Sequence, residues 1–103
     1  MIDSVVEATL MASYSVKDNR TVSDVLIHMV TEVGELAQEI QIKQGMSYKT
    51  VGADGIAGEA IDVMVCALDI IALSQPKWDE RDILYYVNEK LDKWIKTTTK
   101  VVS

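Results

Sequence analysis

The sequence predicts an all-α protein, a four-helix, bundle-like single domain. Apolar residues recur at intervals of three and four in four segments, which is the spacing of one face of a helix. No pair of segments shows the alternation of a strand hairpin. Hydrophobic residues make up 49% of the chain and include no Phe, as suits helices packed through aliphatic side chains. At 103 residues the chain has room for one domain, so residues 1–103 are treated as a single unit.

Two helices are predicted in the first half of the chain. Apolar residues from Ile2 onward indicate a first helix that ends near Val16, before a polar stretch. Thr21 or Ser23 can cap a second helix, because their hydroxyls accept hydrogen bonds from the first free amides. A wide apolar stripe then predicts an amphipathic helix over about 23–43.

The second half predicts two more helices after a glycine-containing loop. The segment from Ile56 to about Leu73 is apolar almost all the way around, which is typical of a helix at the centre of an assembly. Pro76 breaks the chain, and Asp79 can cap a fourth helix that continues to about residue 96. The last residues, TTTKVVS, are expected to fray.

Composition and charge exclude several classes of function. The formal net charge of −6 argues against binding nucleic acid polymers, which need a basic surface. The longest apolar run, Val63 to Leu73, is interrupted by Asp69 and is shorter than the ~20 residues of a membrane span. The only cysteine, Cys66, has an apolar helical context typical of packing, and the N-terminal segment lacks the basic residues of a secretory signal. We therefore expect a cytoplasmic protein with no membrane partner.

Carboxylates on two predicted helices carry the chemical signal. On the second helix, His28, Glu32, Glu35 and Glu39 fall within a sector of about 60° when each residue advances by about 100°. Glu59 and Asp62 lie on adjacent turns of the third helix. Acidic pairs at this spacing are most often a solvated face, so each pair alone is a weak signal.

The surroundings of these acids favour a metal site over a solvated face. The third helix contains no Lys or Arg, and the second has only Lys43, at its end. Ionised carboxylates buried without partners are costly or become protonated. An all-oxygen ligand set without paired cysteines favours Mg²⁺, with Mn²⁺ as a possible substitute, and Mg²⁺ commonly engages substrate phosphates.

The segments EVGELAQEI and EAIDVM resemble the MazG-like, all-α nucleoside triphosphate pyrophosphatase superfamily, whose pattern is ExxE, a connecting segment and ExxD. The resemblance spans roughly residues 20–96. Glu32 and Glu35 match the first pair, and Glu59 and Asp62 match the second. Many members carry a further glutamate where this chain has Thr31, so that position is left out of the metal set. KLDKW, at 90–94, is similar to a basic and aromatic segment late in the last helix of several relatives.

The resemblance implies Mg²⁺-dependent cleavage of a nucleoside triphosphate between its α and β phosphates, giving a monophosphate and pyrophosphate. It also implies sites built from more than one subunit. A monomer of this size can hardly surround the third helix, so we expect an obligate homodimer or a dimer of dimers, which is a homotetramer. Glu35 is the first candidate to accept a proton from the attacking water, with Glu39 behind it. We expect (deoxy)nucleotides in pool sanitation as substrates, although a dUTP or phosphoribosyl-ATP type remains open.

Four residues are candidates for binding the substrate. Lys90 and Lys93 lie with Lys96 and Lys100 on a basic face that could meet phosphates, although lysines near a helix C-terminus are also favoured by the helix dipole. Trp94 could stack on a base or pack in the core, and His28 could reach the site or lie in an interface. Tyr48 and Lys49 in the glycine-containing loop could form part of a lid.

Two readings from other functional classes remain open. The chain could be a non-catalytic helical oligomerisation or interaction module whose acidic faces bind basic partners. It could also be a metal or nucleotide sensor that binds without turnover. Metal-dependent stability and turnover discriminate these readings from an enzyme.

Overall fold

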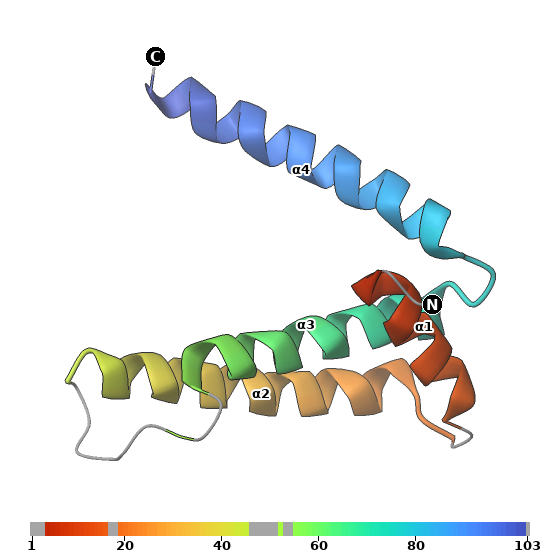
Figure 1. Ribbon diagram of the computed structural model, residues 1–103, viewed down its shortest axis with the longest axis horizontal. Helices are drawn as coiled ribbons and strands as arrows, with labels where there is room; N and C mark the ends of the chain where they lie inside the picture. The colour runs from red at the N-terminus through yellow and green to blue at the C-terminus, as the bar shows by residue number, and fades with distance from the viewer. Residues whose placement is uncertain (1–3, 17–18, 46–51, 53–54, 103) are drawn as a thin grey trace.

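The computed structural model describes residues 4–16, 19–45, 52 and 55–102. Within these ranges the chain is all-helical, and no strand is present, as predicted. The four helices, shown in Figure 1, are α1 (Val5–Ser15), α2 (Val22–Lys43), α3 (Gly55–Ser74) and α4 (Glu80–Val102). None of these described helices has the length and apolar character that a bilayer span requires.

Side-chain caps begin three of the helices. At α1, Ser4 Oγ accepts a hydrogen bond of 3.2 Å from the amide of Glu7. Thr21 and Asp24 form a reciprocal capping box at the start of α2, with bonds of 3.0 and 3.1 Å. Asp79 forms the same kind of box with Asp82 before α4, with bonds of 2.9 and 3.1 Å. Capping by Thr21 and Asp79 confirms the two helix starts that the sequence indicates.

The C-terminal end of α4 differs from the prediction. The helix was expected to end at about residue 96, but it continues to Val102. The segment after Lys96 contains neither Gly nor Pro, and β-branched residues lower helix propensity only slightly. Thr97 also places its hydroxyl on the carbonyl of Lys93, at 2.8 Å, without interrupting the helix.

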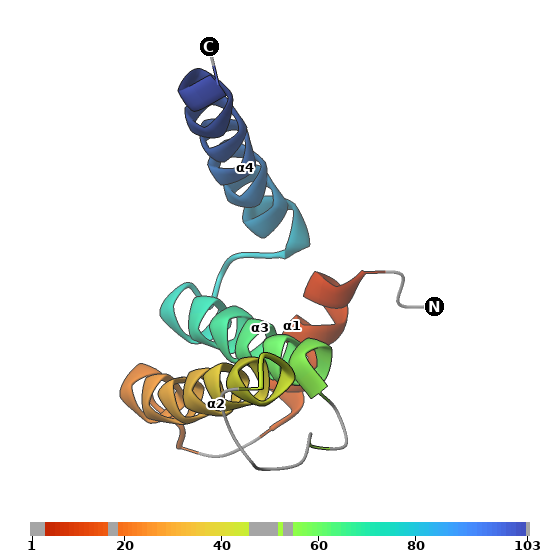
Figure 2. The ribbon, with the colours of Figure 1, turned by 90° about the vertical axis from the view of Figure 1, so that its left-hand side faces the viewer.

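Helices α2 and α3 lie side by side and run antiparallel, and α1 crosses α3 toward its C-terminal end (Figures 1 and 2). The small buried cluster consists of Leu10 from α1, Ala72 from α3 and Ile83 from α4. This core joins three helices at one end of the molecule. The long α2–α3 seam extends away from it and carries the acidic side chains.

α4 joins the rest of the chain only at its N-terminal end. Ile83 is 1% exposed, and Trp78 stacks on Tyr86 with ring centroids 4.7 Å apart. Further along, α4 leaves the other helices (Figure 2). Its apolar side chains Trp94 and Ile95 are 67% and 59% exposed. Among the described helices, only α1 lies against the backbone of α4. A single chain therefore packs three helices together and leaves the fourth largely uncovered.

The overall dimensions agree with this open arrangement. The radius of gyration is 16.4 Å, whereas a compact chain of this length has one of about 13 Å. α3, which was expected at the centre of an assembly, is covered by α1 and α2 but keeps Ile61 and Met64 53% and 42% exposed. These uncovered apolar side chains are the structural basis for the assembly proposed below.

Candidate metal centre

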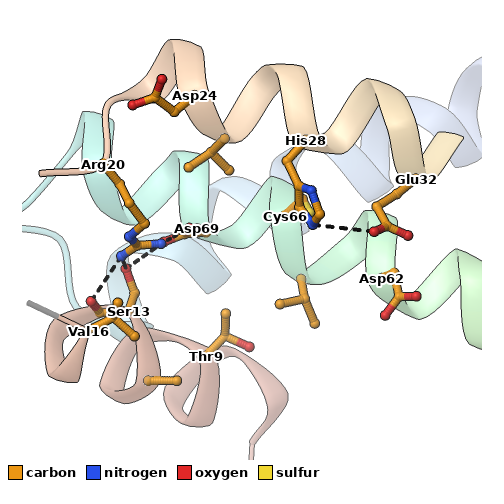
Figure 3. Close-up of a pocket in the computed structure, with 13 residues that line it drawn as sticks. Thr9, Ser13, Val16, Arg20, Asp24, His28, Glu32, Asp62, Cys66 and Asp69 are labelled. Carbon is orange, nitrogen blue, oxygen red and sulfur yellow. Dashed lines mark hydrogen bonds and ion pairs between the residues drawn. The ribbon is translucent and has the colours of Figure 1, made fainter. Parts of the chain in front are cut away.

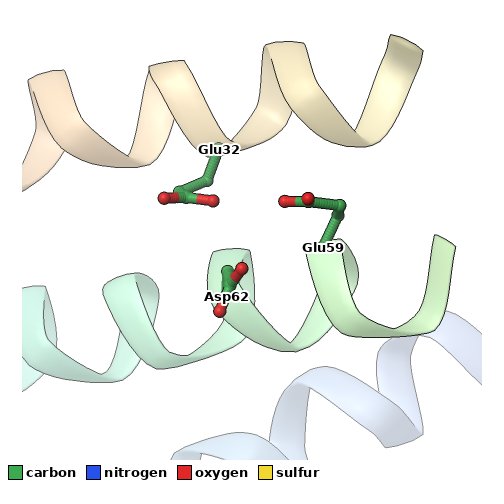
Figure 4. A group of neighbouring side chains, drawn as sticks. All are labelled: Glu32, Glu59 and Asp62. Carbon is green, nitrogen blue, oxygen red and sulfur yellow. The ribbon is translucent and has the colours of Figure 1, made fainter. Parts of the chain in front are cut away.

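Three carboxylates meet across the α2–α3 seam. Glu32 reaches from α2 toward α3, while Glu59 and Asp62 come from adjacent turns of α3 (Figure 4). One oxygen from each lies within 4.8 Å of the other two. The three-residue spacing of Glu59 and Asp62 puts both on one face of α3, and the antiparallel packing brings Glu32 opposite them. We call this group the carboxylate centre.

The centre is partly shielded from water and lacks positive charge on its own helices. Oε2 of Glu32 and Oε2 of Glu59 are buried and have no hydrogen-bond partner among the described residues. α3 carries no Lys or Arg, and α2 carries only Lys43, at its last position. Nε2 of His28 lies 3.3 Å from Oε1 of Glu32, and the imidazole is charged only when it is protonated. Buried oxygens without donors are expensive to maintain and indicate a missing partner.

The pKa values of the acids show the same lack of nearby positive charge. Desolvation, followed by repulsion from Glu35, Asp62 and Glu32, raises the pKa of Glu59 to about 7. Desolvation and the neighbouring acids Glu35 and Asp62 also raise the pKa of Glu32, with His28 acting in the opposite direction. Without an added cation, the centre therefore retains protons at a pH at which an ordinary glutamate has lost them.

A divalent cation fits these residues. Carboxylate oxygens converging within a few ångströms are the ligands that Mg²⁺ and Mn²⁺ prefer, and the two orphaned oxygens provide free acceptors. Of the four predicted metal ligands, the structure brings three together. Glu35 is exposed and is not one of the three, but its charge and hydrogen bonding raise the pKa of Glu59. It lies beside the centre and interacts with both Glu32 and Glu59.

Glu39 has a different environment from the other acids of α2. It is 8% exposed and accepts two hydrogen bonds from the amide of Gly52, with N–O distances of 2.9 and 3.2 Å. A Cβ at Gly52 would lie 2.7 Å from Oε1 of Glu39, so the glycine permits this close approach. Glu39 thus connects α2 to the segment before α3, and this contact engages its carboxylate.

The predicted substrate-binding residues occupy two regions. His28 borders the carboxylate centre through Glu32, with its own side chain 66% exposed. Lys90, Lys93 and Trp94 lie on the uncovered part of α4. Lys90 and Trp94 line an apolar groove of about 460 Å³ with Ile71, Trp78 and other α4 residues. Within one chain, the structure does not bring these α4 residues to the carboxylates, because α4 meets the other described helices only near its N-terminal end.

A cavity of about 440 Å³ adjoins the centre and lies between α1, α2 and α3. Glu32 and Asp62 stand at one end, and Arg20 and Asp69 at the other (Figure 3). At that far end Asp69 forms an ion pair with Arg20, and Oγ of Ser13 donates a 2.6 Å hydrogen bond to Oδ1 of Asp69. The η2 nitrogen of Arg20 donates to the carbonyl of Ser13, at 3.2 Å.

No pattern in the sequence links Asp69 to Arg20 or Ser13. Asp69 lies two turns beyond Asp62 on the same face of α3, and this spacing is visible in the sequence. Arg20 and Ser13 are 49 and 56 residues away from Asp69, so no local pattern reveals them. Tyr48 and Lys49, proposed for a lid, lie outside the described residues.

Comparison with known proteins adds no assignment. No protein-family model, no curated protein and no solved structure matches the chain. The functional argument therefore rests on the residues of the carboxylate centre and their surroundings.

Proposed function

We propose that the protein is a Mg²⁺-dependent pyrophosphohydrolase that converts nucleoside triphosphates to monophosphates and pyrophosphate, acting on (deoxy)nucleotides of the cytoplasmic pool and not on nucleic acid polymers. The observation that carries the proposal is the carboxylate centre. It has three convergent acids, two orphaned oxygens and no basic residue within α3. The ExxE and ExxD segments supply its ligands, and their resemblance to the MazG-like superfamily supplies the reaction.

We assign different roles in the reaction to the acids of the centre and its surroundings. Glu32, Glu59 and Asp62 would hold the cation, which would neutralise phosphate oxygens and acidify a water. Glu35, exposed beside them, is the group placed to accept the proton of that water. Glu39 is held by the amide of Gly52, so its proposed reserve role requires release of this contact.

The proposal includes self-association. α4 carries an uncovered apolar face together with Lys90, Lys93 and Lys96, whereas the carboxylates lie on α2 and α3. In a homodimer or a homotetramer, α4 of one copy covers apolar surface of another and places Lys90 or Lys93 near the partner's phosphate site. A monodisperse monomer in light scattering at micromolar concentration, in the presence of Mg²⁺, contradicts this assembly.

The activity test uses Mg²⁺, a panel of nucleoside triphosphates with modified bases included, and separation of pyrophosphate from orthophosphate. The expected products are a monophosphate and pyrophosphate. The variant Glu59→Gln should abolish turnover of every substrate, because it removes the charge of a proposed metal ligand while keeping a side chain of similar size. Glu7→Gln, an exposed acid on α1, is the matched control and should behave as the wild type. Turnover that is retained by Glu59→Gln removes the centre from the reaction.

A non-catalytic oligomerisation module is the second candidate function, and the exposed apolar face of α4 favours it. Such a module requires no cation, so Mg²⁺ should leave its melting temperature unchanged. A metal or nucleotide sensor differs from both, since Mg²⁺ or nucleotide raises its melting temperature while no product forms. Thermal melts with and without Mg²⁺, combined with the product assay, separate the three functions.

A further inference from the structure

The cavity between α1, α2 and α3 has a chemical character that differs from that of the carboxylate centre it adjoins. Its walls are formed largely by small apolar side chains, together with Thr9, Asp24 and His28. The apolar ones are Ala12 from α1, Val16 at the C-cap of α1, Val25 from α2, and Val65 and Cys66 from α3. Flat or weakly polar groups are favoured against such walls, because burial of apolar surface is favourable and apolar side chains require no hydrogen bond from the ligand. The volume of about 440 Å³ falls within the range typical of small-molecule sites.

The two polar ends are separated by a fixed length of helix. Asp62 and Asp69 are seven residues apart on α3, which corresponds to two turns and a rise of about 10.5 Å. Both side chains line the same cavity. A ligand with phosphates at the carboxylate centre therefore has a path along α3, past Val65 and Cys66, toward Asp69. The length of this path matches a sugar and a base joined end to end.

The geometry points to the cavity as the site of the nucleoside part of the substrate, and we propose that sugar and base lie along its apolar walls with the polar edge of the base at Asp69. This inference rests on the proposed function, since it takes the phosphates of the same molecule to lie at the carboxylate centre. It assigns Asp69 as a specificity-determining residue and Val65 as a wall of the base site.

The far end of the cavity is built to present fixed polar atoms. The carboxylate of Asp69 is held on one side by Arg20 and on the other by the hydroxyl of Ser13, and its side chain is 14% exposed. A carboxylate has about four acceptor positions, so these contacts leave some for a ring N–H or amino group. Because neighbours already fix the acceptor, little rotamer entropy is lost on binding. Arg20 and Ser13 act here as positioning residues.

Filling the cavity tests the proposal without touching the carboxylates. Val65 is 41% exposed and lines the cavity, so Val65→Trp should occupy the path while the fold tolerates the change. Val5→Trp is the matched control, since Val5 is 56% exposed on α1 and does not line the cavity. Circular dichroism and melting temperature establish that both variants fold.

Two probes are titrated by calorimetry in the presence of Mg²⁺: an α,β-methylene nucleoside triphosphate, which resists cleavage, and inorganic tripolyphosphate, which lacks a nucleoside. Val65→Trp should weaken binding of the nucleotide analogue at least about tenfold, the loss of ~1.4 kcal/mol, and leave tripolyphosphate binding unchanged. Val5→Trp should change neither. An unchanged affinity of Val65→Trp for the nucleotide analogue, equal weakening of both probes, or a wild type that does not bind the nucleotide analogue overturns the proposal.

Asp69→Asn tests the assignment of the base edge. The amide is nearly isosteric but replaces an acceptor by a donor, so the order of affinities among analogues with the four common bases should change. A uniform change for all four bases overturns the role of Asp69 in base recognition. These outcomes are independent of turnover. If the wild type binds the nucleotide analogue but hydrolyses nothing, and Val65→Trp weakens that binding, the proposed hydrolysis is refuted and the cavity is still the nucleoside site.

Discussion

Asp62 and Asp69 lie on the same face of α3, two turns apart, and have opposite surroundings. Asp69 is neutralised within the chain, by the guanidinium of Arg20 and the hydroxyl of Ser13. Asp62 lies with Glu32 and Glu59, and two oxygens of those glutamates have no donor among the described residues. Among the described residues, the fold thus neutralises the carboxylate of Asp69 and provides no cationic partner from α3 for the acids around Asp62. In the absence of metal, removal of a negative charge should therefore lower the stability of the chain at the Asp69 end of the cavity and should not lower it at the carboxylate centre.

The largest expected effect is on catalysis at the unsatisfied end. Glu59→Gln should lower kcat/KM by more than the roughly 10–100-fold that loss of an outer-shell partner causes, because it removes a ligand itself. In metal-free buffer the same variant should be at least as stable as the wild type, since it removes like-charge repulsion. Steady-state kinetics and melts in a chelator check both parts. A variant that is less stable than the wild type without metal contradicts the comparison.

The next effect is on stability at the satisfied end. Asp69→Ala leaves Arg20 and Ser13 without their shared acceptor in a partly buried site, which should cost about 2 kcal/mol in the free energy of unfolding. The control is Asp92→Ala, which breaks the Asp92–Lys96 pair of 2.9 Å between side chains that are 64% and 74% exposed. That control should cost less than about 0.5 kcal/mol. Urea denaturation measures both, and equal losses would remove the distinction between the two pairs.

The pH dependence of stability sharpens the comparison further. The pKa of Glu59 is about 7 in the folded chain, against 4.5 for an ordinary glutamate, so the folded chain keeps this proton to a higher pH than the unfolded chain. The stabilisation is fully present below about 4.5 and is lost as the pH rises through about 7. In a chelator, the melting temperature of the wild type should therefore fall over this range more steeply than that of Glu59→Gln. Parallel curves for the two proteins would contradict the raised pKa.

The smallest effect concerns a single hydroxyl. Ser13→Ala removes the 2.6 Å hydrogen bond to Asp69 and should cost about 1 kcal/mol. Ser15→Ala is the matched control on the same helix, because the hydroxyl of Ser15 contacts only the local carbonyl of Ala12, at 2.8 Å, among the described contacts. A cost for Ser13→Ala no larger than that of its control would mean that the hydroxyl contributes little to the satisfied end.

Features governed by local chemistry were predictable from the sequence. The hydroxyl of Thr21 and the carboxylate of Asp79 cap the next free amides, so these two helix starts are visible in the sequence. The spacing of Glu59 and Asp62 places them on one face of a helix. They approach Glu32 because α2 and α3 pack antiparallel. The sequence indicated that acids from these two helices serve one metal site, but it did not define how the helices pack.

Other features depend on contacts between distant parts of the chain. Arg20 and Asp69 are 49 residues apart, and no periodicity links them. Glu39 shares a helical face with Glu32, yet its carboxylate accepts hydrogen bonds from the amide of Gly52, thirteen residues further along the chain. The predicted end of α4, near residue 96, was wrong, because the following segment, which was expected to fray, continues the helix to Val102. These cases show that helical spacing defines a face, whereas the partner of that face is set by tertiary packing.

The hydrogen bond from Ser13 to Asp69 has a consequence for the order of folding. It closes a span of 56 residues, whereas α2 and α3 form a helical hairpin across a much shorter connection. Loop-closure entropy rises with the length of chain enclosed, and local contacts therefore tend to form first. We therefore expect the carboxylates of the hairpin to meet before α1 docks, so that the cavity beside them gains its third wall last.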